Sequence, residues 1–180
     1  MNKFRKDLYR YFGDENISIK ILLYIIFSPH LLYIFYFRMA NNTKGVTRWF
    51  FRILLLLKSI KTNIQIPFTT KIGEGFYIGH WGRVIINGNV KIGRNVNIAT
   101  GVTIGQTNRG PKKGCPVIGN NVWIGTNAVI VGNITIGDDV LIAPLSFVNM
   151  SIPDHSIVIG NPAKIIYRED ATKDYINRTV

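Results

Sequence analysis

Aliphatic residues return at every sixth position through most of the chain between residues 66 and 148. Three uninterrupted runs share this spacing: Ile66, Ile72 and Ile78; Ile86, Ile92, Ile98 and Ile104; and Ile118, Ile124, Ile130, Ile136, Ile142 and Val148. A period of six matches neither an α-helix, at about 3.6 residues per turn, nor a single β-strand, at about two. It predicts short strands joined by tight turns, stacked as the coils of a parallel β-helix over residues 66–152.

The six-residue spacing is interrupted twice. The first break lies between residues 78 and 86, where a step of eight inserts two extra residues beside His80. The second lies between residues 104 and 118, where a step of fourteen predicts a loop over Gln106–Pro116. Because functional residues lie preferentially on irregular segments held by a rigid scaffold, we expect the functional site at these two breaks.

Residues 1–62 show helical periodicity instead. Four segments are expected to be helical: Lys3–Tyr11, Ile17–Phe27, residues 29–40 and Thr47–Ile60. Ser28, followed by a proline, is expected to be an N-cap. The simplest interpretation is a helical cap that buries its apolar faces on the first coil and on neighbouring subunits, because the ends of a solenoid need covering.

The chain carries 22 Lys and Arg residues against 10 Asp and Glu, a formal net charge of +12. This excess predicts an anionic partner: a membrane surface, a nucleic acid, a phosphate-bearing cofactor or an acidic glycan. Nucleic acid is disfavoured, because the basic residues of the helical region are interleaved with apolar runs and no base-reading motif is present. The same interleaving suits contact of residues 1–60 with an anionic membrane surface. Ile21–Phe37 is the candidate membrane span, but it is short and contains Pro29 and His30.

Cys115 is the only cysteine, so no disulfide can form within the chain, which fits a reducing compartment. The amino terminus is basic, but its apolar stretch begins only near Ile17 and no small-residue cleavage site follows, so no secretory signal is expected. We therefore expect a cytoplasmic protein, with residues 1–60 available for peripheral contact at the inner membrane face.

Three segments are expected along the chain: a helical region over residues 1–62, a β-helix domain over residues 63–166 and a tail over residues 167–180. Ile157–Gly160 is expected to add one more strand, after which Gly160–Lys164 forms a bend. The polar end, Arg168–Val180, is expected to be a short helix or a frayed tail.

The repeats, the insertion at His80, the loop before Val117-Ile118 and the bend at Gly160–Ala163 together resemble the hexapeptide-repeat acyltransferases, in particular the serine acetyltransferase-like group. The resemblance covers about residues 63–166. It implies an all-β left-handed parallel β-helix with an N-terminal α-helical region, a homotrimer, and acetyl-CoA bound in a groove between adjacent subunits. The helical leader also resembles that of members found with capsule and exopolysaccharide synthesis. Because one fold hosts several activities, function must be argued from the site.

Within this resemblance, Ile78-Gly79-His80 matches the motif that bears the catalytic histidine, which implies that His80 is the general base. Acetyl transfer from a thioester to an alcohol requires removal of the hydroxyl proton, and a neutral imidazole with a pKa near ~6.5 suits that step. A backbone N–H in a glycine turn can stabilise the oxyanion. An exposed turn histidine without function is the alternative, but the inserted residues re-aim this side chain and favour function.

The chain departs from the serine acetyltransferase pattern at the residues around the histidine. Gln65 stands where those enzymes have the aspartate that orients it. A glutamine oxygen can fix the imidazole tautomer but stabilises imidazolium less than a carboxylate does; alternatively Glu74 assists, or Gln65 is a plain turn residue. The substrate-binding aspartate is replaced by Gly79, and the Arg-His pair at the end of the loop is replaced by Gly114-Cys115.

These replacements remove the groups that hold an amino acid, so a roomier and less charged site favours a sugar hydroxyl. The candidate acceptor contacts are Gly79, Trp81 and Cys115. For Cys115 the alternative is a small packing residue, and a covalent role would require an activating base nearby.

The resemblance also implies the coenzyme A contacts: Gly105, Gln106, Thr126, Pro144, Asn161 and Lys164. Lys164 and the loop cations Arg109, Lys112 and Lys113 can meet phosphates, although each can equally be a solvated surface charge. No metal is expected. Zinc enzymes of this fold need three histidines around an open site, and one of the three histidines here, His30, lies in the helical leader.

Three functions remain open from the sequence. The first is an acetyl-CoA-dependent O-acetyltransferase acting on a sugar hydroxyl of a capsular polysaccharide, an exopolysaccharide or its lipid-linked precursor. The second is the serine O-acetyltransferase of cysteine biosynthesis. The third is a non-catalytic trimeric scaffold or membrane-docking module, which Gln65 and Cys115 would favour.

Overall fold

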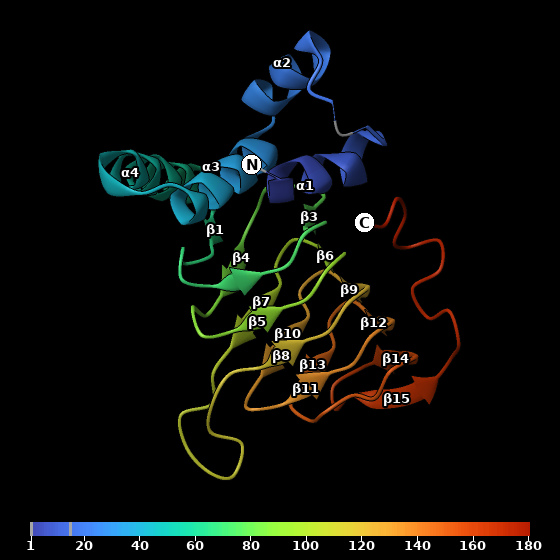
Figure 1. The fold of residues 1–180 in the computed structure, drawn as a ribbon. Coiled ribbons are helices and arrows are strands. Elements are labelled where there is room, and N and C mark those ends of the chain that lie inside the picture. The colour runs from blue at the N-terminus through green and yellow to red at the C-terminus, as the bar shows by residue number, and fades with distance from the viewer. Residues whose placement is uncertain (1, 15) are drawn as a thin grey trace.

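The computed structural model describes residues 2–14 and 16–180 as a helical cap seated on one end of a parallel β-helix (Figure 1). The helices are α1 (Asn2–Phe12), α2 (Ile19–Phe27), α3 (Pro29–Asn42) and α4 (Gly45–Thr62). All four expected helical segments are confirmed, with ends displaced by one or a few residues.

The junction between α2 and α3 lies at Ser28. Its backbone N–H donates to the carbonyls of Tyr24 and Ile25, at 2.9 and 3.3 Å, and closes α2. Pro29 then begins α3, so the expected cap position is confirmed, but the Ser28 hydroxyl makes no capping hydrogen bond to α3. None of the described helices alone has the length and apolarity of a membrane span, although α2 and α3, bent by 98°, together meet that test by length and composition.

The strands are short and form three parallel sheets. They are β1 (Ile64–Gln65), β2 (Lys71–Ile72), β3 (Tyr77–Ile78), β4 (Val84–Ile86), β5 (Lys91–Ile92), β6 (Asn97–Ile98), β7 (Thr103–Gly105), β8 (Val117–Ile118), β9 (Val122–Ile124), β10 (Val129–Val131), β11 (Thr135–Ile136), β12 (Val140–Ile142), β13 (Phe147–Val148), β14 (Ser156–Ile159) and β15 (Lys164–Tyr167). Sheet A has the order β1-β4-β7-β10-β13, sheet B the order β2-β5-β8-β11, and sheet C the order β3-β6-β9-β12-β14-β15.

The strand register explains the six-residue repeat. Each aliphatic residue of the repeat pairs with its equivalent in the next coil, as Ile72 pairs with Ile92 and Ile92 with Ile118 in sheet B. These side chains are buried along the axis of the β-helix. Every coil therefore extends one apolar column, and the predicted β-helix is confirmed.

Both breaks in the repeat lie between sheets. The first lies in the turn of residues 79–83, where the chain passes from β3 in sheet C to β4 in sheet A. The second is the Gln106–Pro116 loop between β7 in sheet A and β8 in sheet B, which projects from the solenoid in Figure 1. Its stem is closed by two backbone hydrogen bonds of 3.0 Å between Thr107 and Gly114.

A buried ion pair fastens the cap to the first coil. The guanidinium of Arg38, on α3, donates to both carboxylate oxygens of Asp7, on α1, at 2.7 and 3.0 Å. Arg38 also donates to the carbonyl of Ile72 at 2.9 Å, and Asp7 accepts from the backbone N–H of Phe76 at 2.9 Å. The cap is thus held by directed polar contacts as well as by its apolar face.

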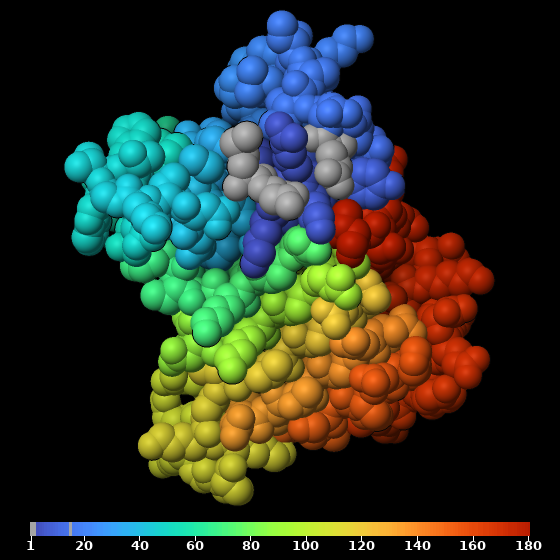
Figure 2. Space-filling view, in the orientation of Figure 1, coloured from blue at the N-terminus to red at the C-terminus, as the bar shows by residue number. Residues whose placement is uncertain are grey.

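The tail of the chain is ordered, so the expected short helix or frayed end over residues 168–180 is wrong. After the antiparallel strand β15, this segment turns back along sheet C towards α1, where Figure 2 shows the red C-terminal segment beside the blue helical cap. Asp139 accepts from the backbone N–H groups of Ala171 and Thr172, each at 2.9 Å. At the far end, Arg10 of α1 donates to the carbonyl of Asn177 at 2.7 Å. Polar side chains from a turn beside sheet C and from α1 therefore give the tail backbone its partners.

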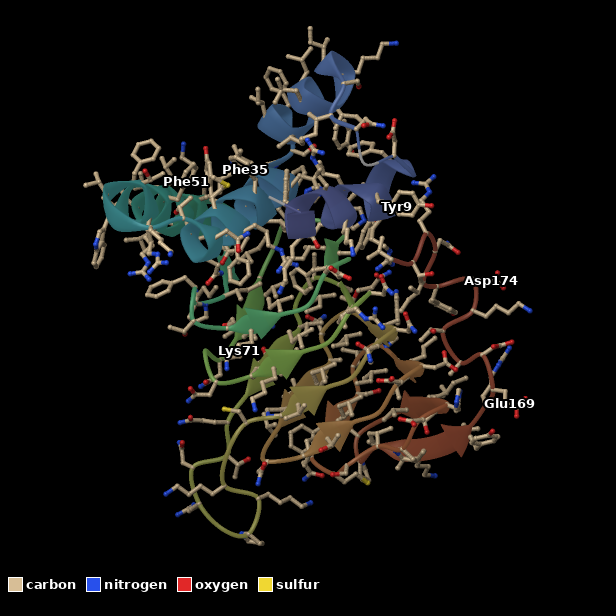
Figure 3. All side chains as sticks on the ribbon, in the orientation of Figure 1. Tyr9, Phe35, Phe51, Lys71, Glu169 and Asp174 are labelled. Carbon is tan, nitrogen blue, oxygen red and sulfur yellow. The ribbon has the colours of Figure 1, made fainter. Side chains whose placement is uncertain are left out.

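One face of α4 packs on α3, where Phe35 and Phe51 meet edge to face with ring centroids 6.0 Å apart (Figure 3). The other faces of α2 and α4 remain apolar and exposed. Their exposed large side chains are Ile19, Leu22, Leu23, Tyr24, Ile26 and Phe27 on α2 and Val46, Trp49, Phe50, Ile53, Leu56, Leu57 and Ile60 on α4. Contact of residues 1–60 with neighbouring subunits or with a membrane stays a prediction.

Candidate active site

The candidate site follows one edge of the β-helix, here called the C/A edge, where the chain turns from sheet C into sheet A. His80 lies in its first turn, Thr126 in the turn between β9 and β10, and Pro144 in the turn between β12 and β13. Backbone hydrogen bonds stack these turns, as from Leu145 N–H to the Thr126 carbonyl at 3.0 Å. Four of the predicted residues, His80, Thr126, Pro144 and Asn161, therefore lie along one edge.

The first turn of the C/A edge is longer than the others. From Ile78 to Ile86 the chain takes eight residues, whereas the equivalent step from Ile98 to Ile104 takes six, although both pairs occupy equivalent inward positions. The two extra residues displace His80 and Trp81 outward, and both side chains are exposed. The inserted turn predicted from the sequence is confirmed.

Three other predicted residues lie on a different edge, here called the A/B edge. Gly105 ends β7, and Gln106 and Cys115 lie in the loop between β7 and β8, where sheet A turns into sheet B. Sheet A therefore separates them from His80 within one chain. A second copy whose A/B edge lay against this C/A edge would bring the two groups together, which is the arrangement that the expected trimer would have.

An aromatic cluster from the cap supports the turn that bears His80. The Tyr11 hydroxyl, on α1, accepts from the Ile78 N–H and donates to the Ile78 carbonyl, both at 2.8 Å. The Tyr11 ring also stacks on Tyr77 with centroids 4.3 Å apart. The end of β3 is thus fixed two residues before the histidine.

Sequence reasoning missed His30 as a neighbour of the candidate base. Its side chain lies at the start of α3, is 6% exposed, and stacks on Trp81 with ring centroids 6.2 Å apart. Within residues 2–14 and 16–180 its Nδ1 atom has no hydrogen-bond partner. Burial, and then the nearby His80, lower the pKa of His30 to about 4. His30 is therefore uncharged at physiological pH, and its ring lines the site beside Trp81.

The low pKa of His30 predicts a pH-dependent stability. Below pH ~6.5 the unfolded chain binds a proton at His30 that the folded chain takes up only near pH 4. The free energy of unfolding should therefore fall by about 3 kcal/mol across that window because of this group. Urea unfolding of the wild type and His30→Phe, followed at pH 7 and pH 4.5, measures the difference. Curves that shift equally with pH in both proteins would contradict the prediction.

The structure places the two candidates for orienting His80 differently. Gln65 lies on β1, pairs with Ile85 of β4 and points outward from sheet A; among the described residues no hydrogen bond joins it to His80. Glu74 lies between β2 and β3, away from the C/A edge, and bonds Lys6 at 2.9 Å. That hydrogen bond holds the pKa of Glu74 below its ordinary value. Gln65 therefore stays the predicted orienting residue. Glu74 does not lie on the C/A edge that carries His80.

The predicted acceptor contacts differ in their surroundings. A Cβ at Gly79 would lie 3.3 Å from Cε1 of Tyr77, closer than an ordinary contact, so glycine lets this turn pass close to that ring. Trp81 is 57% exposed. Cys115 is half-buried and packs against the core, and burial raises the pKa of its thiol. A raised pKa disfavours the reactive thiolate, so packing is the better account of Cys115.

The remaining histidine, His155, and one loop cation, Lys112, are engaged with the chain itself. His155 bonds Asp139 at 2.9 Å, and Lys112 donates to the Asn149 carbonyl at 2.6 Å. In the part of the chain that the structure describes, no group of three or more His, Cys, Asp or Glu side chains could hold a metal ion.

Comparison with known proteins agrees with this geometry. A family model described as bacterial transferase hexapeptide (six repeats) matches residues 115–149. Serine acetyltransferase of Helicobacter pylori is 34% identical over 118 residues, which cover 66% of this chain and 69% of that protein. Serine acetyltransferase 2 of Arabidopsis thaliana is 37% identical over 123 residues, covering 62% of this chain and 38% of the relative.

Solved structures extend the likeness to the whole fold. The crystal structure of serine acetyltransferase from Brucella abortus in complex with coenzyme A has a TM-score of 0.77 and 26% identity, covering 93% of this chain and 67% of that one. A soybean serine acetyltransferase complexed with serine has a TM-score of 0.73 at 25% identity, covering 91% and 66%. The predicted left-handed β-helix with an N-terminal helical region is thereby confirmed.

The fold and the repeat define a hexapeptide-repeat transferase. Within that class, the chain belongs to the serine acetyltransferase family, as the match to most of the Helicobacter pylori protein shows. The first curated relatives are longer, since the chain spans 38 to 53% of their length. The named relatives are serine acetyltransferases, so the expected resemblance to capsule and exopolysaccharide enzymes gains no support from them.

Proposed function

We propose that the protein is an acetyl-CoA-dependent O-acetyltransferase in which His80 is the general base. The observation that carries this proposal is the position of His80. In a chain of the serine acetyltransferase family, the histidine expected to be catalytic lies in the one lengthened turn among the described turns of the C/A edge. An exposed imidazole held on a rigid solenoid is suited to proton transfer near neutral pH.

In the proposed reaction, neutral His80 takes the proton of the acceptor hydroxyl as that oxygen attacks the thioester carbonyl. A tetrahedral oxyanion forms, and a backbone N–H of the turn can donate to it. The carbon–sulfur bond then breaks, and the imidazolium of His80 gives its proton to the departing thiolate. Gln65 would fix the imidazole tautomer by accepting its other N–H, as an amide oxygen can do without adding charge.

Coenzyme A is proposed to lie along the C/A edge. From one subunit the contacts to coenzyme A would be Thr126, Pro144, Asn161 and Lys164. The first three lie along the C/A edge, and Lys164 begins β15 at the end of that edge. Gly105 and Gln106 would come from the A/B edge of a second copy. A homotrimer with sites between subunits meets this requirement, and a relative with this fold is seen in complex with coenzyme A.

L-Serine is the proposed acceptor, because the relatives named above act on serine by name and one is complexed with it. A saccharide hydroxyl is the second candidate. It is favoured by this chain's own residues: Gly79 brings no carboxylate to the turn that bears His80, and the exposed Trp81 ring offers a flat apolar surface beside His80.

An acceptor assay tests both candidates. Purified protein with acetyl-CoA is expected to release free thiol when L-serine is added, and Gly79→Asp, which restores the family's substrate carboxylate, should raise kcat/KM for serine by roughly tenfold. Thiol release with saccharides but not with serine would replace the first acceptor by the second. Absence of thiol release with every acceptor would instead support the non-catalytic scaffold.

A further inference from the structure

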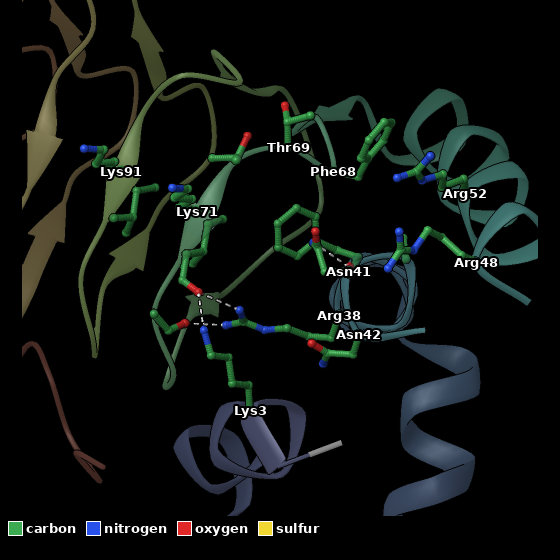
Figure 4. Close-up of a pocket in the computed structure, with 16 residues that line it drawn as sticks. Lys3, Arg38, Asn41, Asn42, Arg48, Arg52, Phe68, Thr69, Lys71 and Lys91 are labelled. Atoms are coloured by element: carbon green, nitrogen blue, oxygen red, sulfur yellow. Dashed lines mark hydrogen bonds between the residues drawn. The ribbon is translucent and has the colours of Figure 1, made fainter. Parts of the chain in front are cut away.

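A basic pocket lies against the cap at the A/B edge of the first coil, whereas His80 lies at the C/A edge. It has a volume of about 630 Å³ and lies between α3, α4 and the first two strands of sheet B (Figure 4). Its cationic lining comes from four elements besides α3: Lys3, Arg48, Arg52, Lys71 and Lys91. No carboxylate lines it among the described residues, and neither His80 nor any predicted coenzyme A contact does.

Two of these cations face each other without a counter-ion. Lys71 and Lys91 occupy paired register positions on the neighbouring strands β2 and β5, and both side chains are exposed. Like charges placed directly opposite across strands are destabilising. In residues 2–14 and 16–180, no ion pair is formed by either lysine. A negatively charged ligand between them would remove this repulsion.

The pocket also holds polar atoms that lack partners. The Arg52 guanidinium lies over the Phe68 ring, 3.8 Å from its centroid, yet its Nε atom is buried without a hydrogen-bond partner in the described chain. Thr70, which is 3% exposed, likewise has an unpartnered hydroxyl. Because buried polar groups are almost always hydrogen-bonded, these two point to a ligand that can accept hydrogen bonds in the pocket.

The cation Arg38 does not share this role, although it lines the pocket. Its guanidinium is bonded to both Asp7 oxygens and to the Ile72 carbonyl. Arg48 uses its Nε atom on the Thr43 carbonyl at 2.6 Å, which leaves its terminal nitrogens facing the pocket in Figure 4. The free cations are therefore two arginine forks from α4 on one side and the paired lysines on the other.

We propose that this pocket binds a diphosphate attached to an organic group. A diphosphate offers several acceptor oxygens and at least two negative charges, matching two guanidinium forks and two lysines. The volume exceeds the needs of a single phosphate, and the half-buried Phe68 adds apolar surface for the attached group. None of the predicted coenzyme A contacts lines the pocket, so we treat it as a binding site distinct from the proposed acetyl-CoA site.

Titration calorimetry of the full chain with inorganic pyrophosphate tests the proposal. We expect saturable binding at low ionic strength that weakens as salt is added. Lys71→Gln and Arg52→Gln should each weaken the affinity by roughly tenfold or more, since each removes a charged contact. Lys173→Gln on the tail makes the same change in net charge and should leave the affinity unchanged.

Further titrations identify the source of the diphosphate. UDP binding more tightly than pyrophosphate would indicate a soluble nucleotide, whereas farnesyl diphosphate binding more tightly would indicate a lipid carrier; either result supports the pocket. Lys164→Gln separates the pocket from the proposed coenzyme A groove, and it should not alter pyrophosphate affinity. No binding at millimolar pyrophosphate overturns the proposal. The proposal is also overturned if Lys164→Gln or Lys173→Gln lowers the pyrophosphate affinity as much as Lys71→Gln does.

Discussion

Replacement of His80 by alanine is expected to lower kcat for acetyl transfer by a factor of about 10²–10⁴, the usual contribution of a positioned general base. The reason is chemical: without the imidazole, the acceptor hydroxyl must attack while it still carries its proton. KM for acetyl-CoA should change little, because the predicted cofactor contacts lie in later turns of the C/A edge and, for Gly105 and Gln106, on the A/B edge. Thiol release under saturating acetyl-CoA measures the effect.

The matched control is His155→Ala. This histidine is also exposed, but it lies in the last coil, in the turn before β14, bonded to Asp139, and it has no place in the proposed reaction. Its activity should stay within about twofold of the wild type, as is usual for surface positions outside a site. Activity of His80→Ala equal to that of His155→Ala would remove His80 from the mechanism.

Replacement of Asp7 by asparagine is expected to destabilise the fold by about 3–5 kcal/mol, because it leaves the buried charge of Arg38 without its partner. The effect should be large because both side chains are almost fully buried and the carboxylate also holds the Phe76 N–H. Urea unfolding followed by circular dichroism measures it as a lower midpoint.

A surface ion pair that also involves α1 provides the control. Lys6 and Glu74 also join α1 to the first coil at 2.9 Å, but both are partly exposed. Glu74→Gln should therefore cost no more than about 1 kcal/mol. The double variant Asp7→Leu with Arg38→Met should recover part of the loss, because no buried charge remains. A loss below about 1 kcal/mol for Asp7→Asn would mean that the buried pair contributes little to stability.

The coils could be predicted because their determinant is local and repeated. Each buried aliphatic residue needs only its equivalent one coil away, so a six-residue spacing carries the architecture. The two interruptions could be predicted equally well, because a step of eight or fourteen residues cannot fit a regular coil. The helices followed from their own periodicity, with errors confined to their ends, where hydrogen bonds such as that from Thr43 to the Met39 carbonyl decide the boundary.

The tail could not be predicted, because its partners are remote and polar. Residues 168–180 carry no apolar period, and their order depends on acceptors such as Asp139 and Asn95 in the turns between sheets B and C. The surroundings of His80 could not be predicted from the sequence, for a similar reason. His30 and Tyr11 belong to helices whose packing on the first coil leaves no local signal in the sequence. The basic pocket arises from the same packing.

The returning tail changes how this solenoid behaves as a whole. Coils that contact only their neighbours can open from either end, one at a time. Here Arg10 and Asn177 are joined although they lie 167 residues apart in the chain, and Arg178 reaches the Tyr11 carbonyl as well. Closing so long a segment is entropically slow, so the tail should dock late in folding. Once docked, the tail links the two ends of the chain. The first helix and the last residues should therefore lose their structure together.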